Sequence, residues 1–143
     1  MVGELMIDQA KRALEVGIAE NCLRVAPKCT VLVVEDDEMI RTAIAEILEM
    51  MGYAVVVACD GEDAVDLLQV GLEPNAVVLD MMMPRMDGWT FLSRIRADPK
   101  YQELPVVVAS AVVSERPAGA DRWLQKPFEM AELDRALAHL CAH

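Results

Sequence analysis

Asp80 stands at the end of a short run of apolar, strand-forming residues, Ala76–Leu79, and a loop sequence containing Pro84 and Gly88 follows it. An uninterrupted apolar run of this kind is typical of a strand that is buried on both faces of a parallel sheet. Open α/β sheets carry their chemistry at the carboxyl ends of such strands. We therefore interpret Asp80 as the leading candidate for a reactive carboxylate.

A second acidic group follows another apolar run in the same way. Thr30–Val34 leads directly into Glu35, Asp36 and Asp37. If the two strands are neighbours, their carboxylates converge at one edge of the sheet, where they repel one another unless a cation lies among them. Carboxylate oxygens are the ligands that hard divalent cations prefer. The sequence therefore predicts a divalent metal site, and Mg2+ is the ion we expect.

The acidic run leaves two choices for the metal-binding pair, Glu35 with Asp36 or Asp36 with Asp37. The first two acids after the strand lie closest to the edge of the sheet, so we take Glu35 and Asp36. Asp37 is better placed to cap the following helix with its side chain. Asp60 and Asp87 each precede a glycine at an expected helix start, and we interpret both as helix caps.

Apolar residues recur with helical or strand spacing along the rest of the chain. In the helix expected over Gly88–Ala97, Trp89, Leu92 and Ile95 should face the core. Strands alternating with helices predict an α/β protein with a doubly wound, five-stranded parallel sheet. We expect strands at residues 30–34, 53–58, 76–79, 105–109 and 121–125, and helices at residues 38–51, 61–71, 88–97 and 128–141.

Composition limits the classes of partner. The 143 residues include 24 acidic and 13 basic side chains, a formal charge of -11, which argues against binding to nucleic acid or anionic membrane. No apolar stretch reaches the roughly 18–20 residues that span a bilayer. Cys22, Cys29, Cys59 and Cys141 show neither Cys-x-x-Cys spacing nor the density of a disulfide scaffold. We therefore expect them to be small buried hydrophobic residues or reduced thiols of a cytoplasmic protein.

Four motifs follow four of the expected strands in order. Glu35–Asp36 follows the first strand, Asp80 the third, Ser110 the fourth and Lys126-Pro127-Phe128 the fifth. In this combination the chain resembles the receiver domain of bacterial response regulators from Cys29 onward. The resemblance implies a flavodoxin-like receiver fold over residues 29–143, preceded by a helical extension over residues 1–28.

The resemblance also implies a role for each site residue. Asp80 would be the phosphoacceptor, taking a phosphoryl group from a sensor histidine kinase or a histidine phosphotransfer protein. Mg2+ would be bound by Asp36, Asp80 and the main-chain carbonyl of Met82, and Glu35 would hold it through water. The protein would then be a signalling phosphoacceptor rather than an enzyme, acting on a downstream protein target.

Two further side chains would contact the phosphoryl oxygens. Ser110 would donate its hydroxyl and Lys126 its ammonium, which together with the metal neutralise the developing charge. Trp123 occupies the family's aromatic switch position, so Ser110 and Trp123 are the expected switch pair. Because Pro127 follows Lys126, we predict a cis peptide bond that directs the lysine over the edge of the sheet.

The connection between the last two strands departs from the family. From Ser110 to Asp121 it is about as short as a crossover with a helix can be, roughly 10–12 residues, and it contains Pro117 and Gly119. We expect the family's helix to be shortened or missing here. Val106, Val108 and Leu124 would then face water on one side of the sheet.

The extension over residues 1–28 carries an apolar stripe that includes Leu5, Leu14 and Ile18. A helix of this length is marginal in water unless it packs on something. It either rests on the domain as a terminal helix, or covers the strands left open by the short connection, or forms the seam of a homodimer.

Three functions compete. The leading one is a stand-alone phosphorylation switch that signals by protein contact or relays the phosphoryl group. The same fold could also serve as a phosphorylation-independent interaction module. A Mg2+-dependent aspartyl-phosphate phosphohydrolase is a weaker alternative, because such enzymes carry an acid/base Asp two residues after the nucleophile and this chain has Met82 there.

Overall fold

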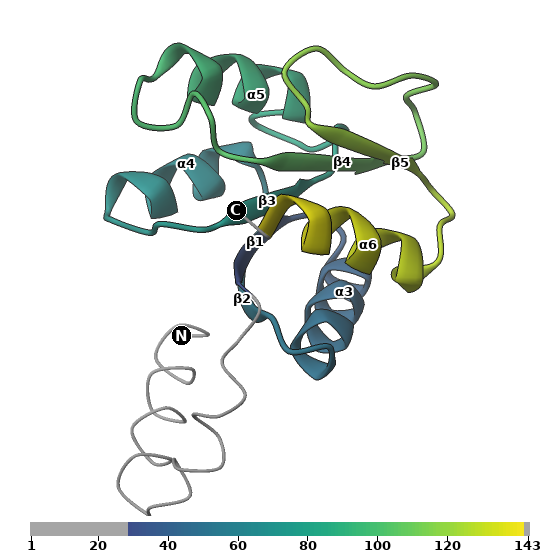
Figure 1. The fold of residues 1–143 in the computed structure, drawn as a ribbon. Coiled ribbons are helices and arrows are strands. Elements are labelled where there is room, and N and C mark those ends of the chain that lie inside the picture. The colour runs from purple at the N-terminus through teal and green to yellow at the C-terminus, as the bar shows by residue number, and fades with distance from the viewer. Residues whose placement is uncertain (1–28, 142–143) are drawn as a thin grey trace, which may run out of the picture.

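The computed structural model describes residues 29–141, so the expected helix over residues 1–28 and its apolar stripe lie outside the described residues (Figure 1). No helix within the described part of the chain is long and apolar enough to cross a membrane. The strands are β1 (Thr30–Val34), β2 (Ala54–Ala58), β3 (Ala76–Leu79), β4 (Val106–Ser110) and β5 (Arg122–Gln125), and the helices are α3 (Glu38–Met50), α4 (Gly61–Gln69), α5 (Gly88–Ala97) and α6 (Met130–Cys141).

All five strands are parallel, in the order β2-β1-β3-β4-β5. The chain runs outward from β1 to β2 and then returns to place β3 on the other side of β1. This reversal makes the carboxyl ends of β1 and β3 the switch point of the sheet, which is where open α/β sheets bind ligands. Val34 pairs with Leu79 in register, so the residues that follow these two strands emerge side by side.

Helices cover both faces of the sheet, as the alternating pattern predicted (Figure 1). On one face α4 and α5 pack against β-strand residues such as Leu32, Leu79 and Val108, which are fully buried. On the other face α3 and α6 contribute Leu48 and Leu133 to a second core. The strands are therefore apolar on both sides, which explains their uninterrupted Val-rich runs.

The prediction of which α5 residues face the core was wrong for Trp89. Phe91, Leu92 and Ile95 are buried, but Trp89 is 43% exposed. Gly88 takes the inward position in the first turn, where a Cβ would lie 2.5 Å from the sulfur of Met81. This close approach sets the rotation of the helix and turns Trp89 toward the surface.

The connection between β4 and β5 contains no helix: residues 111–121 form turns and bends. The expectation that Val106 and Val108 would face water was nevertheless wrong, because both are fully buried. Val113 and Ala120 from the connection are themselves buried against the α4/α5 core and cover β4. Two apolar side chains of an irregular segment thus cover β4 in place of a helix.

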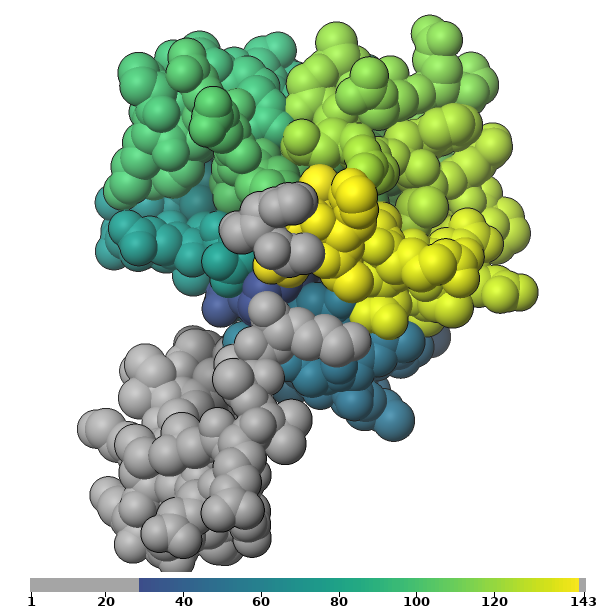
Figure 2. Space-filling view, in the orientation of Figure 1, coloured from purple at the N-terminus to yellow at the C-terminus, as the bar shows by residue number. Residues whose placement is uncertain are grey.

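Arg96 of α5 holds this connection in place. Its guanidinium donates to the carbonyl of Gly119 at 2.9 Å and forms an ion pair with Asp121 at 3.2 Å. The connection consequently lies alongside the segment that contains α5 (Figure 2). Leu124 is half-buried and packs on the opposite face, against the α3/α6 core.

Two cysteines are paired, which corrects the expectation of reduced thiols. Cys29 and Cys141 form a disulfide across a sequence separation of 112 residues. No local spacing could indicate this pair, because only the fold brings the end of α6 beside the start of β1. Cys59 is free and exposed, and Cys22 lies outside the described residues.

Candidate functional site

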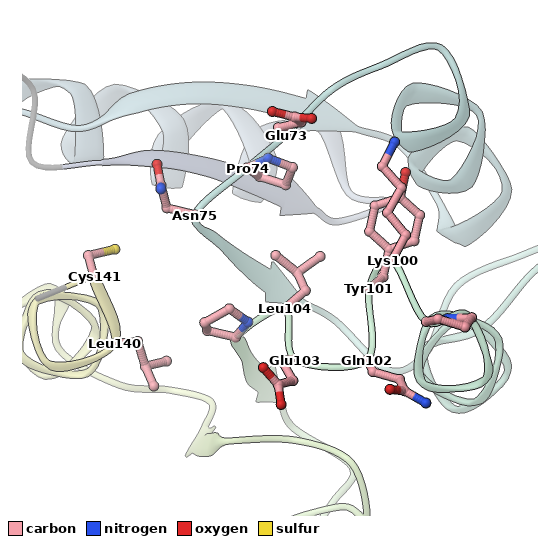
Figure 3. Close-up of a pocket in the computed structure, with 12 residues that line it drawn as sticks. Glu73, Pro74, Asn75, Lys100, Tyr101, Gln102, Glu103, Leu104, Leu140 and Cys141 are labelled. Atoms are coloured by element: carbon pink, nitrogen blue, oxygen red, sulfur yellow. The ribbon is translucent and has the colours of Figure 1, made fainter. Parts of the chain in front are cut away.

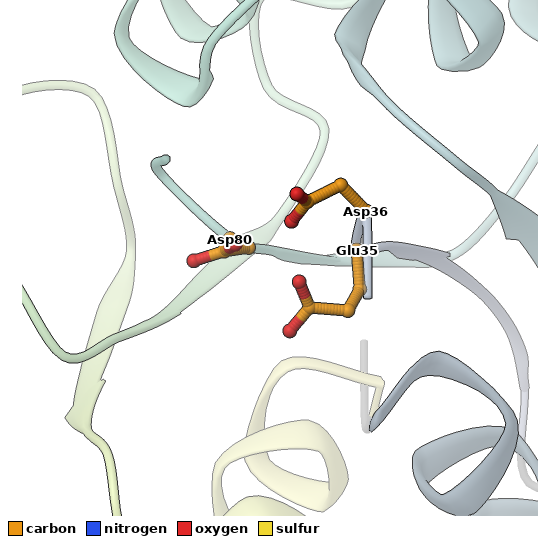
Figure 4. Close-up of side chains that lie close together, drawn as sticks. All are labelled: Glu35, Asp36 and Asp80. Carbon is orange, nitrogen blue, oxygen red and sulfur yellow. The ribbon is translucent and has the colours of Figure 1, made fainter. Parts of the chain in front are cut away.

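Three carboxylates meet at the switch point between β1 and β3 (Figure 4). Glu35 and Asp36 follow β1 and Asp80 follows β3, and the hydrogen-bond ladder continues through them, since the Asp80 N–H donates to the Val34 carbonyl at 3.0 Å. One oxygen from each of the three carboxylates lies within 4.8 Å of the others. The convergence that the strand ends predicted is therefore present.

The three carboxylates differ in their surroundings. Glu35 is 3% exposed, Asp80 is half-buried and Asp36 is exposed. Burial raises the pKa of Glu35, an effect opposed by its hydrogen bond with Lys126 and reinforced by the Asp80 carboxylate. The pKa of Asp36 is also raised, by partial burial and by the neighbouring Glu35. Burial and the neighbouring negative charge both disfavour the ionised form of a carboxylate, which is why the two pKa values move in the same direction.

The site fits a Mg2+ ion. Three carboxylates supply oxygen ligands within reach of one another, and Lys126 is the ammonium within the described residues that contacts them. Three negative charges therefore face one positive charge, and a hard divalent ion taking oxygen ligands would balance them. Met82, the other expected ligand, lies two residues beyond Asp80 with its side chain 57% exposed.

Lys126 reaches into this cluster from the end of β5. Its Nζ donates a hydrogen bond to Glu35 Oε1 and lies 3.9 Å from Asp80 Oδ1. The Lys126–Pro127 peptide bond is cis, as predicted. The Lys126 N–H also donates to the carbonyl of Ser110 at 3.0 Å, which ties the ends of β4 and β5 together.

Ser110 and Trp123 lie where the strand order predicted. Ser110 ends β4, is 1% exposed, and its Oγ accepts a hydrogen bond from the Val112 N–H at 3.3 Å. Trp123 pairs with Val108 in register and packs against the α4/α5 core. The indole N–H of Trp123 is buried without a hydrogen-bond partner.

The three expected caps are confirmed. Asp37 caps α3 by accepting from the N–H groups of Met39 and Ile40, and Asp87 caps α5 through Thr90. Asp60 caps α4, accepting from the Asp63 N–H at 2.8 Å. Each of these aspartates is therefore occupied outside the acidic cluster, which supports Glu35 and Asp36 as the metal-binding pair.

Two arginines near the site were not anticipated. Arg41 of α3 donates to the main-chain carbonyls of Glu35 at 3.0 Å and Asp36 at 3.4 Å. Arg85, in the loop after β3, bonds the buried carboxylate of Asp60 at 2.6 Å. Arg41 could have been suspected from its place one turn into the helix, but the Asp60–Arg85 contact has no local sequence signal.

A separate hollow of about 710 Å3 lies at the opposite, amino end of the sheet (Figure 3). It is bordered by the segments that precede β3 and β4 and by Leu140 and Cys141 at the end of α6. Its polar groups include Glu73 from the segment before β3 and Lys100 and Glu103 from the segment before β4, and among the described residues they form no acidic cluster of the kind found after β1 and β3. The acidic cluster found in the described part of the chain therefore lies at the other edge of the sheet.

A doubly wound sheet with a cluster of carboxylates and a lysine at its switch point defines a class of signalling α/β domain. The chain belongs to the response regulator receiver domain family, whose sequence profile matches residues 31–138. Response regulator MprA from Mycolicibacterium vanbaalenii is 43% identical over 109 residues, covering 72% of this chain and 46% of that protein. The chain thus spans about half the length of the curated relatives it matches.

Solved structures agree with this assignment. The receiver domain of a Francisella response regulator matches with a TM-score of 0.73 at 32% identity, over 80% of this chain and 97% of that one. The receiver domain of a sensor histidine kinase from Pseudomonas aeruginosa matches with a TM-score of 0.74 at 29% identity, over 80% and 98% of the two chains. That structure holds a magnesium ion in its active site cleft.

Proposed function

We propose that the chain is a phosphorylation switch in which Asp80 accepts a phosphoryl group from a histidine kinase or a histidine phosphotransfer protein. The observation that carries this proposal is the convergence of Glu35, Asp36 and Asp80 within 4.8 Å, with Lys126 bonded to the cluster. Family membership and the magnesium-containing relative support the same role.

In the transfer step an Asp80 oxygen forms a bond to phosphorus while the bond from phosphorus to the histidine nitrogen breaks. The imidazole keeps the electron pair of that bond and takes up a proton. The Met81 N–H, which donates to Asp80 Oδ1 at 2.9 Å, restrains the carboxylate for in-line attack. Little covalent work is left for the protein beyond positioning and neutralising charge.

The remaining site residues supply that neutralisation. Asp36, Asp80 and the main-chain carbonyl of Met82 would bind Mg2+, with Glu35 acting through water. When bound, the ion neutralises charge on the phosphoryl oxygens. Lys126 would leave Glu35 for a phosphoryl oxygen, a short move because its Nζ already lies 3.9 Å from Asp80 Oδ1.

Ser110 and Trp123 would carry the signal away from the site. The Ser110 Oγ now accepts from the Val112 N–H, and its hydroxyl would turn to donate to a phosphoryl oxygen, moving the start of the β4–β5 connection. Trp123 lies on the neighbouring strand, and its buried indole N–H has no partner to hold it in its present place. A shift of the connection would therefore be transmitted to Trp123 through direct packing.

We further propose a cytoplasmic domain over residues 29–143 that signals to a downstream protein without contacting nucleic acid or membrane itself. The strongly acidic composition supports this partner class. The extension over residues 1–28 would form a homodimer seam or rest on the domain.

The test is labelling with acetyl phosphate and Mg2+, followed on a phosphate-affinity gel. The wild type should be labelled, and Asp80→Asn or added EDTA should abolish labelling. Asp87→Asn is the matched control, because Asp87 is an aspartate that caps α5 outside the cluster. Labelling retained in Asp80→Asn would refute the assignment, and no labelling of the wild type would favour a phosphorylation-independent interaction module.

A further inference from the structure

The loop after β3 is tied to the fold at both of its ends. At its start the Gly88 N–H donates to the Met81 carbonyl at 2.9 Å. At its far end the Gly61 N–H donates to the Met86 carbonyl at 3.1 Å, and the approach is so close that a Cβ on Gly61 would lie 2.8 Å from that oxygen. Met82 lies between these two anchors, and its own side chain is too exposed to hold it.

Arg85 strengthens the attachment of the loop at Met86, and its own backbone conformation is unusual. Its φ is 62°, in the left-handed region that residues with a Cβ rarely adopt. Such conformations persist where the surroundings hold them, and they cluster at functional sites. The Arg85 side chain is 58% exposed, yet its Nε donates at 2.6 Å to Asp60, whose side chain is 3% exposed.

Asp60 divides its two oxygens between two tasks. Oδ1 accepts the Asp63 N–H and caps α4, while Oδ2 receives the Arg85 guanidinium. Asp60 follows β2 and Arg85 lies in the loop after β3, so the ion pair joins two loops at the same edge of the sheet as the acidic cluster. Glu62 also faces Arg85, but at 3.8 Å and from an exposed position.

We propose that Asp60 and Arg85 are positioning residues for the Mg2+ site. Their ion pair fixes the backbone on the far side of Met82, so that the Met82 carbonyl and the Asp80 carboxylate are presented together to the ion. Outer-shell groups of this kind set metal affinity by orienting the ligands. The inference rests on the proposed function, because it assumes that Mg2+ binds to Asp36, Asp80 and Met82.

The experiment measures Mg2+ affinity directly, by titrating the phosphate-free protein and recording tryptophan fluorescence. Trp89 lies in the first turn of α5, directly after the loop, and is a natural reporter. In Arg85→Gly the glycine adopts the positive φ without strain, and the ion pair with Asp60 is lost. In Asp60→Asn the side-chain oxygen Oδ1 still caps α4, and the negative charge is lost. Both should raise the Mg2+ dissociation constant by about 10-fold. Arg85→Lys should recover part of the affinity, and Glu62→Gln, the matched control, should bind as the wild type does.

A second readout separates positioning from general stability. The rate of labelling by acetyl phosphate should be reduced in Arg85→Gly at low Mg2+ and return to the wild-type rate at saturating Mg2+. An unchanged dissociation constant in both variants, or a rate deficit that saturating Mg2+ does not remove, would overturn the inference. If Asp60→Asn does not fold, Arg85→Gly and Arg85→Lys decide the question. Failure of the proposed function is distinct, because the wild type itself would then show neither Mg2+ binding nor labelling.

Discussion

Lys126 donates a hydrogen bond to Glu35 across the sheet, although β3 and β4 separate the strands from which the two residues emerge. The contact joins positions 91 residues apart and places the ammonium over the acidic cluster. Lys126 is therefore a counter-ion for the carboxylates, and in the proposed function it would also become a ligand for the phosphoryl group. In the first role the ammonium would compete with Mg2+ for the carboxylates, whereas in the second it would bind the phosphoryl oxygens.

Replacing Lys126 by Gln should separate these roles. Mg2+ should bind more tightly, because a positive charge is removed beside its ligands; an interaction of about 1 kcal/mol corresponds to about fivefold in affinity. Labelling by acetyl phosphate should become slower, since the phosphoryl oxygens lose a cation. Fluorescence titration and gel analysis measure the two effects. Weaker Mg2+ binding in the variant would show that Lys126 orders the carboxylates rather than competing with the ion.

The aspartyl phosphate should be long-lived. Hydrolysis needs an oriented water, and the positions two residues beyond Asp80 and Ser110 carry Met82 and Val112, which are exposed and apolar. Neither side chain can hydrogen-bond that water. Met82→Asn should speed the loss of phosphate by at least about tenfold, measured after acetyl phosphate is removed. Met50→Asn, at another exposed methionine, is the control. Decay of the wild type within seconds would contradict this reasoning.

The Cys29–Cys141 disulfide should stabilise the domain. It closes a loop of 112 residues, and losing a native disulfide typically costs about 2–5 kcal/mol. A reducing agent or Cys141→Ser should therefore lower the melting temperature, whereas Cys59→Ser should not, because Cys59 is free. Identical melting curves with and without reductant would show that the two cysteines are not paired in solution.

Asp60 should make the free energy of unfolding depend on pH in the acidic range. Burial alone would raise its pKa, but the Asp63 N–H and the Arg85 guanidinium outweigh that effect and lower it. The resulting stabilisation is present above the unfolded pKa of about 4 and is lost as pH falls through the lower folded value. Asp60→Asn should cost about 1 kcal/mol at neutral pH. Denaturation at several pH values should show this difference shrinking below pH of about 4, and a constant difference would contradict the assignment.

Deleting residues 1–28 should leave the melting temperature of the domain nearly unchanged. Val106 and Val108 are already covered by Val113 and Ala120, so no apolar face of β4 needs the extension. Calorimetry of the shortened chain tests the expectation, and sedimentation shows whether the deletion removes a dimer. Aggregation or a large fall in melting temperature would mean that the extension is part of the core.

Local pattern determined the outline of this protein. Apolar runs place the strands, and the polar residue after each run must lie at the carboxyl edge of a parallel sheet, which is why Glu35, Asp36 and Asp80 could be found from the sequence. Lys126 was found through the resemblance of Lys126-Pro127-Phe128 to the family's motif. The caps Asp37 and Asp87 were equally local, because a side chain reaches only the next few backbone N–H groups. The type and order of these elements follow from periodicity within short windows.

Contacts between distant segments were decided only by the tertiary structure. Trp89 faces outward because Gly88 must approach Met81, a packing constraint that helical periodicity does not contain. The Cys29–Cys141 disulfide and the Asp60–Arg85 ion pair join residues 112 and 25 positions apart. An irregular segment that buries its own Val113 likewise has no periodic signature. Each of these features depends on where two elements meet in space, and that meeting is set by the packing of the whole sheet and its helices.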